Sequence, residues 1–216
     1  MVEDNLKNIL SELPPEVKLV AVSKFHPVED ILAAYNAGQR RFGENRPQEF
    51  AAKVAALPGD IEWHFIGHLQ TNKLKLVLPY ASLVESIDSL RLLEAVERWG
   101  SDRGKVTDVL LELHLGAEET KGGLTEREIE DILMSDSYPH VRFRGLMGMA
   151  TNTDDVSVVE ADFSRIEAFK KNLEERLALP DFSELSIGMS HDWPLAVRHG
   201  ATIIRVGSAI FGPRSY

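Results

Sequence analysis

Short apolar runs alternate with amphipathic segments along the whole chain. The first run, KLVAVSK at 18–24, is typical of a buried strand. The segment after it carries apolar residues at the i, i+3, i+4 and i+7 spacing of a helix, namely Val28, Ile31, Leu32 and Tyr35. Pro27 fits the first helical position and Gly38 the residue just past the last turn, so the pattern also predicts where this helix begins and ends.

The same strand-then-helix unit recurs to the end of the chain. Ser89 is expected to cap one later helix that ends at Gly100, and Thr125 with Glu128 forms a capping box ahead of another. Seven of the eight predicted strands precede a helix, and after 18–24 the strands are expected at 40–45, 61–68, 82–88, 108–115, 142–150, 184–190 and 201–212.

Strands that alternate with helices form a parallel sheet, and eight such units predict an α/β fold with a single (β/α)8 TIM-type barrel over residues 1–216. An open doubly wound sheet ranks second, because no glycine-rich dinucleotide-binding turn follows the first strand. With roughly 27 residues per unit, the chain lies at the small end of the barrel range, which leaves no room for an inserted domain.

Composition narrows the class of protein. The formal net charge of −10 argues against a nucleic-acid surface, which needs a basic footprint. No cysteine is present, so disulfides and thiolate chemistry are excluded. The acidic, amphipathic N-terminus lacks a signal-peptide core, and no stretch approaches the length of a membrane span. We therefore expect a cytoplasmic protein with no membrane or nucleic-acid partner.

Candidate chemistry gathers where the predicted strands end. Lys24 terminates an otherwise apolar strand, and a desolvated lysine is the usual Schiff-base former. The backbone amides of Gly207 and Ser208, with Ser190 on the preceding unit, predict an anion site of the kind that barrels build after strands seven and eight. Arg205 lies two residues before Gly207 on the same strand face. A phosphorylated aldehyde suits such a site, because its aldehyde reacts with the lysine amine and its phosphate fits the anion site. Pyridoxal 5′-phosphate (PLP) is the commonest compound of this kind.

Nearby polar residues have plainer interpretations. His64 and His68 are four apart and lack a third ligand in sequence, which favours packing or hydrogen bonding over a metal site. Asp88 is expected to cap the following helix rather than act as a base. Glu44 is either a solvated rim charge or a ligand-facing group. Met149 is expected in the pocket wall.

Seven short stretches in series resemble the pyridoxal phosphate homeostasis proteins, which are similar to the isolated N-terminal barrel of alanine racemase. The stretches are LVAVSK, FGEN, HFIGHLQTNK, ESIDS, GLMGMAT, LSIGMSHD and IRVGSAIFG. The resemblance implies that Lys24 carries PLP as an internal aldimine. It also implies Asn45 near the cofactor, Arg205 at the pyridine nitrogen, and a phosphate site made by Ser190, Gly207 and Ser208.

Two functions remain open: a PLP carrier in intracellular PLP homeostasis, and a PLP-dependent amino-acid racemase. An arginine at the pyridine nitrogen only donates, which weakens the ring as an electron sink and favours a carrier without dedicated turnover. Racemisation also needs a second base, a tyrosine in alanine racemase, and none of the four tyrosines is expected at a strand exit: Tyr35, Tyr80, Tyr138 and Tyr216. A Schiff-base aldolase is a third class of function. It would be colourless when purified, whereas a protein with bound PLP is yellow. We expect a monomer, with PLP-dependent apoenzymes as candidate partners.

Overall fold

The computed structural model describes residues 1–116 and 122–213. Eight parallel strands form a closed barrel in sequence order, and β8 closes it by pairing with β1, with Lys18 opposite Ile203. The strands are β1 (Lys18–Val22), β2 (Arg41–Glu44), β3 (Glu62–Phe65), β4 (Ala81–Ile87), β5 (Thr107–Leu113), β6 (Val141–Gly148), β7 (Glu184–Ser186) and β8 (Ile203–Val206). The predicted (β/α)8 barrel is confirmed, and the open sheet is wrong.

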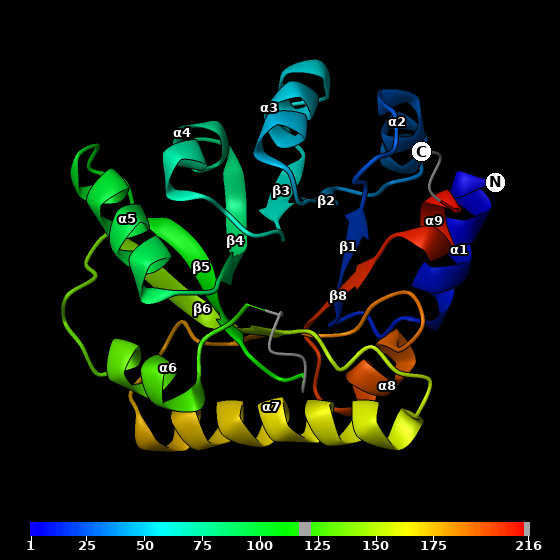
Figure 1. The fold of residues 1–216 in the computed structure, drawn as a ribbon. Coiled ribbons are helices and arrows are strands. Elements are labelled where there is room, and N and C mark those ends of the chain that lie inside the picture. Colours follow the sequence, from blue (N-terminus) through cyan, green and yellow to red (C-terminus); the bar gives the residue numbers. More distant parts are fainter. Residues whose placement is uncertain (117–121, 214–216) are drawn as a thin grey trace.

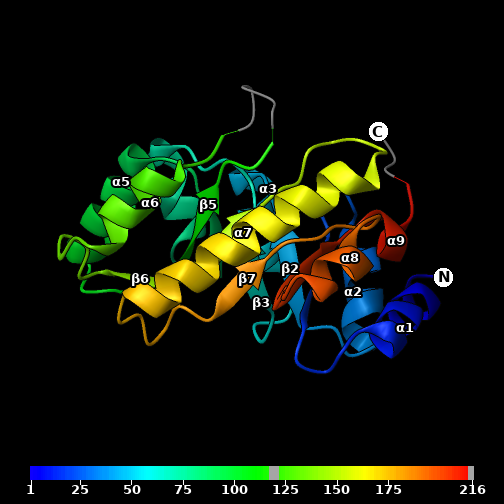
Figure 2. The ribbon, with the colours of Figure 1, turned by 90° about the horizontal axis from the view of Figure 1, so that it is seen from below.

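Helices surround the barrel, as Figures 1 and 2 show. The longest helix, α7, packs on β6, and α1 packs beside α2 and α9, where the chain begins. The helical segments are α1 (Val2–Glu12), α2 (Val28–Asn36), α3 (Pro47–Ala56), η1 (Thr71–Lys73), α4 (Leu74–Val77), α5 (Leu90–Ser101), α6 (Glu126–Leu133), α7 (Val156–Arg176), α8 (Trp193–Arg198) and α9 (Ser208–Phe211). Within the described ranges, no helix is both long and apolar enough to cross a bilayer.

Local capping follows the sequence signals closely. The hydroxyl of Ser89 accepts a hydrogen bond from a backbone amide in the first turn of α5, and Thr125 with Glu128 forms the predicted capping box of α6. Gly38 follows α2 with a φ of 104°, a conformation that glycine adopts without strain. The predicted end at Gly100 is wrong: the helix continues to Ser101. An added Cβ at Gly100 would lie 2.5 Å from the Lys105 carbonyl, so close packing explains this glycine.

The barrel interior changes from apolar to charged along three of its strands. Its apolar layer is small and consists of Val20, Leu83, Leu110, Met147 and Ile203. Two residues further along β4, β5 and β8, the same inward face carries Glu85, Glu112 and Arg205, all buried. Charged groups are costly to bury, so their concentration at the C-terminal end of the barrel marks this end as the functional one.

Candidate functional site

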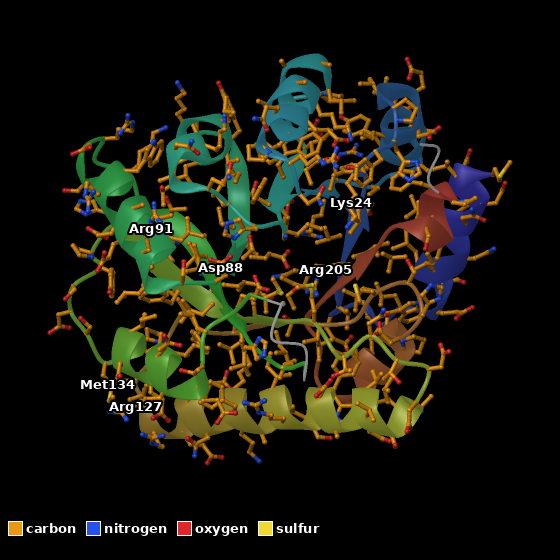
Figure 3. All side chains as sticks on the ribbon, in the orientation of Figure 1. Lys24, Asp88, Arg91, Arg127, Met134 and Arg205 are labelled. Carbon is orange, nitrogen blue, oxygen red and sulfur yellow. The ribbon has the colours of Figure 1, made fainter. Side chains whose placement is uncertain are left out.

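A cavity of about 240 Å³ opens at the C-terminal end of the barrel. It brings together five of the six residues predicted from sequence: Lys24, Ser190, Arg205, Gly207 and Ser208. They come from the segment after β1, the loop after β7, strand β8 and the start of α9, and Figure 3 shows Lys24 beyond the end of β1 and Arg205 on the neighbouring strand β8. Barrel closure therefore joins segments from opposite ends of the chain.

The backbone around Lys24 is held from both sides by two residues of α3. The Nζ of Lys53 donates to the carbonyl oxygen of Ser23 at 2.8 Å, and the amide of Phe25 donates to Oε1 of Glu49 at 2.7 Å. Phe25 has a φ of 69°, which is unusual for a residue with a side chain. Strain of about 1–3 kcal/mol persists only where surrounding contacts enforce it. The two bonds supply that enforcement directly before and after Lys24.

Glu44 is neither a solvated rim charge nor a group that lines the cavity. Its side chain is fully buried, and its Oε1 accepts from Ser23 Oγ at 2.6 Å and from Lys53 Nζ at 2.7 Å. Burial raises the pKa of Glu44, and the Lys53 charge opposes that rise. The expectation of a solvated or ligand-facing group is therefore corrected, because a lysine nine residues later on α3 pairs with it inside the protein. Its Oε2 has no hydrogen-bond partner within the described ranges.

The far end of the cavity carries hydroxyl groups and backbone amides. The amide of Gly207 donates to Ser190 Oγ at 3.2 Å, so the two loops that were predicted to form an anion site do meet. An added Cβ at Gly207 would lie 3.1 Å from the Val22 carbonyl oxygen, so a side chain here would fit only tightly against β1. The loop itself is fixed by Asp192, whose Oδ1 accepts from the Met189 amide at 2.5 Å. Asp192 also directly precedes α8.

Arg205 is buried and held by an interior network that sequence reasoning did not identify. Its Nη1 donates to Ser186 Oγ at 2.5 Å and its Nη2 to the Gly148 carbonyl at 3.0 Å, while Glu85 Oε2 lies 3.7 Å from Nη1. Glu85 also accepts from Ser186 and hydrogen-bonds His64 Nδ1 at 2.6 Å. Burial opposes ionisation of Glu85, yet the bond from His64 and the Arg205 charge lower its pKa. The guanidinium is thus charge-balanced and oriented towards the cavity that it lines.

Glu112 is a second buried carboxyl near this network. Burial is the main cause that raises its pKa to about 7, and the negative charge of Asp88 adds to it. The signal for both interior carboxyls was present in the sequence, since Glu85 and Glu112 interrupt otherwise apolar strands. The partners of Glu85, however, lie on other strands and carry no sequence signature.

Asn45 and Asp88 lie away from the cavity lining. Asn45 directly follows β2 and packs against Gly67, and its Oδ1 is buried without a partner among the described residues. Its place near a cofactor stays a prediction. Asp88 does not cap α5, a role that Ser89 fills; its Oδ2 instead lies 2.5 Å from His68 Nδ1. His64 and His68 therefore bond to different carboxylates, Glu85 and Asp88. No group of three metal-ligating side chains occurs in the described ranges.

The described tyrosines lie outside the mouth of the barrel. Tyr80 directly precedes β4, and Tyr138 lies three residues before β6, so both are at the opposite, N-terminal end. Tyr35, on α2, donates its hydroxyl to Asp60 at 2.7 Å. Tyr216 lies outside the described residues. Among the described tyrosines, none is therefore placed as a second base opposite Lys24.

The donor set of the cavity fits PLP. A lysine amine suits the aldehyde, hydroxyls and backbone amides suit the phosphate, and a guanidinium suits an unprotonated pyridine nitrogen as acceptor. Apolar side chains complete the wall, including Val22, Ile66 and the predicted Met149. An aromatic ring with polar groups at its edge needs this combination.

Comparison with known proteins gives consistent matches over nearly the whole chain. A sequence profile of the family described as alanine racemase, N-terminal domain, matches residues 1–215. The pyridoxal phosphate homeostasis protein of Schizosaccharomyces pombe is 39% identical over 202 residues, which span 92% of this chain and 84% of that protein. The pyridoxal phosphate homeostasis protein of Aquifex aeolicus is also 39% identical, over 203 residues that span 92% of this chain and 88% of that protein.

Solved structures show the same relationship. PipY of Synechococcus elongatus PCC7942 with PLP bound has a TM-score of 0.88 at 37% identity, covering 98% of this chain and 100% of that chain. Alanine racemase of Corynebacterium glutamicum has a TM-score of 0.75 at 15% identity, covering 99% of this chain and 60% of that chain, which shows a shared fold alone.

Proposed function

The chain belongs to the alanine racemase N-terminal domain family and, within it, to the pyridoxal phosphate homeostasis proteins, and we propose that it binds PLP in the cavity at the C-terminal end of its barrel. One observation carries this proposal. Residues chosen from sequence for an aldehyde, a phosphate and a pyridine nitrogen line the same cavity, although up to 184 positions separate them, from Lys24 to Ser208.

Each residue has a distinct role in this proposal. Lys24 holds the cofactor through a Schiff base between its Nζ and the aldehyde carbon. Ser190, Gly207 and Ser208 bind the phosphate by hydroxyl and amide donors, and Arg205 donates to the pyridine nitrogen. When bound, PLP supplies an aldehyde that reacts with primary amines.

We further propose that the protein acts as a carrier in PLP homeostasis without a dedicated turnover. Arg205 stays protonated and is held by Ser186 and Glu85, so it can donate to the ring nitrogen but cannot protonate it. That weakens the electron sink on which most PLP chemistry depends. The positions of the described tyrosines and the names of the relatives both support the carrier over the racemase alternative.

PLP-dependent apoenzymes are the proposed recipients of the cofactor. Transfer needs a bound form that is reversible, and a Schiff base exchanges with water or with another amine. The expectation of a cytoplasmic monomer stays a prediction.

A titration with PLP tests the proposal. The protein should turn yellow and reach one equivalent of bound PLP, whereas Lys24→Ala should stay colourless while keeping its fold. Lys75→Ala is the matched control, because Lys75 is exposed on α4. Turnover is measured separately, as loss of the α-hydrogen of L-alanine in heavy water by proton NMR. Exchange at an enzymatic rate would contradict the carrier assignment, and a yellow Lys24→Ala protein would contradict the site.

A further inference from the structure

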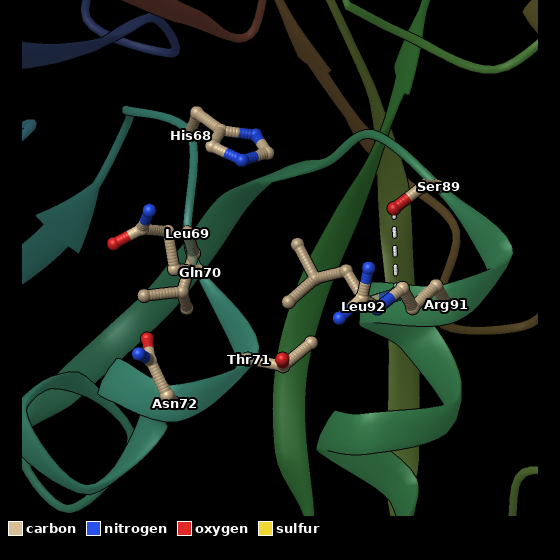
Figure 4. Close-up of a pocket in the computed structure, with 8 residues that line it drawn as sticks. All are labelled: His68, Leu69, Gln70, Thr71, Asn72, Ser89, Arg91 and Leu92. Atoms are coloured by element: carbon tan, nitrogen blue, oxygen red, sulfur yellow. Dashed lines mark hydrogen bonds between the residues drawn. The ribbon is translucent and has the colours of Figure 1, made fainter.

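A polar groove runs along the outside of the barrel beside α5 and shares no lining residue with the cofactor cavity. Two neighbouring hollows, of about 350 and 430 Å³, share Thr71 and Asn72 in their linings, and together they make up this depression. Figure 4 shows the first hollow, with η1 and the loop before it on one side and the start of α5 on the other. We call this depression the α5 groove; the residues that matter below are Gln70, Asn72, Arg91, Arg98 and Arg103.

The wall formed by α5 is cationic. Arg91 and Arg98 are seven residues apart, hence on the same helix face, and both are exposed. Neither forms an ion pair with any residue that the structure describes. Arg103 continues the row and stacks over the Trp99 ring at 4.9 Å. Asp102 is the one acidic residue among the described lining residues, so three arginines face one carboxylate there; exposed Glu94 lies between Arg91 and Arg98 on α5, outside the lining.

The rest of the groove suits an extended peptide. Exposed amide side chains of Gln70 and Asn72 stand opposite the arginines and can pair with a peptide backbone as donors and acceptors. Buried Leu74 and Leu92 form part of the floor. An apolar floor with polar, hydrogen-bonding walls is the usual construction of a protein interface.

One end of the groove lies at the same end of the barrel as the cofactor cavity. It begins at His68 and Ser89, which follow β3 and β4, as Lys24 follows β1. In a parallel barrel all strand exits share one face. That end of the groove therefore opens on the same face of the barrel as the cofactor cavity.

We propose that the α5 groove docks an extended acidic segment of a partner protein. Carboxylates of the segment pair with Arg91 and Arg98, for which arginine offers bidentate geometry. A nucleic acid does not fit, since the overall charge of −10 repels it. That the partner is a PLP-recipient apoenzyme rests on the function proposed above, whereas docking of an acidic segment does not.

Selection from a random displayed nonapeptide library tests the groove directly. The bait is the protein without added PLP, and the selected peptides are then labelled and their affinity measured by fluorescence anisotropy. Peptides rich in Asp and Glu should be enriched, and the double variant Arg91→Glu/Arg98→Glu should bind them about tenfold more weakly or worse, as expected for two lost ion pairs. Arg127→Glu/Lys171→Glu is the matched control, with the same charge change on α6 and α7, and it should bind like the parent protein.

Three outcomes would overturn the proposal: no acidic enrichment, equal loss in both double variants, or full retention in the groove variant. A glutamate at 91 is favourable near the start of α5. If the variant nevertheless unfolds, Arg91→Gln/Arg98→Gln replaces it and should show the same loss. PLP binding separates this result from the function proposed above: the groove variant should still bind PLP, and Lys24→Ala should still bind the peptides.

Discussion

Lys53 offers the sharpest prediction, because this α3 lysine is buried and holds the segment that carries Lys24. Its side chain is only 7% exposed, and its Nζ donates to Ser23, Glu44 and Glu49 at 2.7–2.8 Å. Lys53→Met keeps most of the side-chain volume but leaves the fully buried Glu44 without its counter-charge. Removing one partner of a buried ion pair costs roughly 3–5 kcal/mol, so we expect a loss of that size in the free energy of unfolding.

The loss should depend on pH in a fixed direction. Burial raises the folded-state pKa of Glu44, and the Lys53 charge holds it down, so the variant should raise this pKa further. The folded state then binds the proton more tightly than the unfolded state does. Stability is therefore retained at low pH and lost as pH rises above the ordinary pKa of about 4.3 for an unfolded glutamate. The variant should be closer to the parent protein at pH 5 than at pH 8.

Urea unfolding at both pH values measures this, with Lys75→Met as the exposed-lysine control. Adding Glu44→Gln to Lys53→Met should recover part of the loss, because no buried charge then remains unpaired. PLP affinity should fall as well, since the carbonyl before Lys24 loses its donor. A deficit below about 1 kcal/mol, the range of an exposed pair, would refute the reasoning, as would a deficit that is the same at pH 5 and pH 8.

Three further predictions concern the cavity and the barrel interior. Ser190→Ala should weaken PLP binding by roughly 1–3 kcal/mol and leave pyridoxal unaffected; equal losses in calorimetry would place Ser190 away from the phosphate. Arg205→Gln should weaken PLP binding and make the spectrum of the complex change with pH, because Glu85 loses its cation and the ring nitrogen loses its charged donor. A spectrum identical to that of the parent protein at saturating PLP would show that Arg205 does not touch the ring. Burial raises the folded-state pKa of Glu112 to about 7, so this carboxyl contributes a loss of stability as pH rises from about 4.3 to 7. Glu112→Gln should remove this loss and raise the free energy of unfolding at pH 8 by about 3 kcal/mol. If urea unfolding gave the same dependence of stability on pH for both proteins, the prediction would be contradicted.

Much of the fold was predictable because each strand-and-helix unit carries its own local signals. The apolar run at 18–24 and the helical spacing after it need no long-range information. Closure of the barrel then brings Lys24 beside Arg205 without any further signal, since β1 and β8 must pair. The cavity was predicted for this reason, from chemistry at strand ends alone.

The residues that hold the cavity lining in place were not predictable, because the burial of a charged residue depends on a partner far away in the sequence. Lys53 looks like a solvated residue of an amphipathic helix, and only its contact with Ser23, 30 positions away, shows otherwise. The bond from Ser186 to Glu85 spans 101 positions. Glu44 was misread for the same reason. Such pairs have no periodicity and no motif, so sequence patterns identify the residues that line the cavity and miss the residues that hold them.

Borohydride reduction of the PLP-loaded protein, followed by peptide mass mapping, tests the central claim most directly. Reduction should fix one PLP per chain, on the peptide that contains Lys24, and Lys24→Ala should yield no such product under the same conditions. A product on a different lysine in the parent protein, or the same yield from Lys24→Ala, would contradict the assignment of Lys24 as the residue that holds the cofactor.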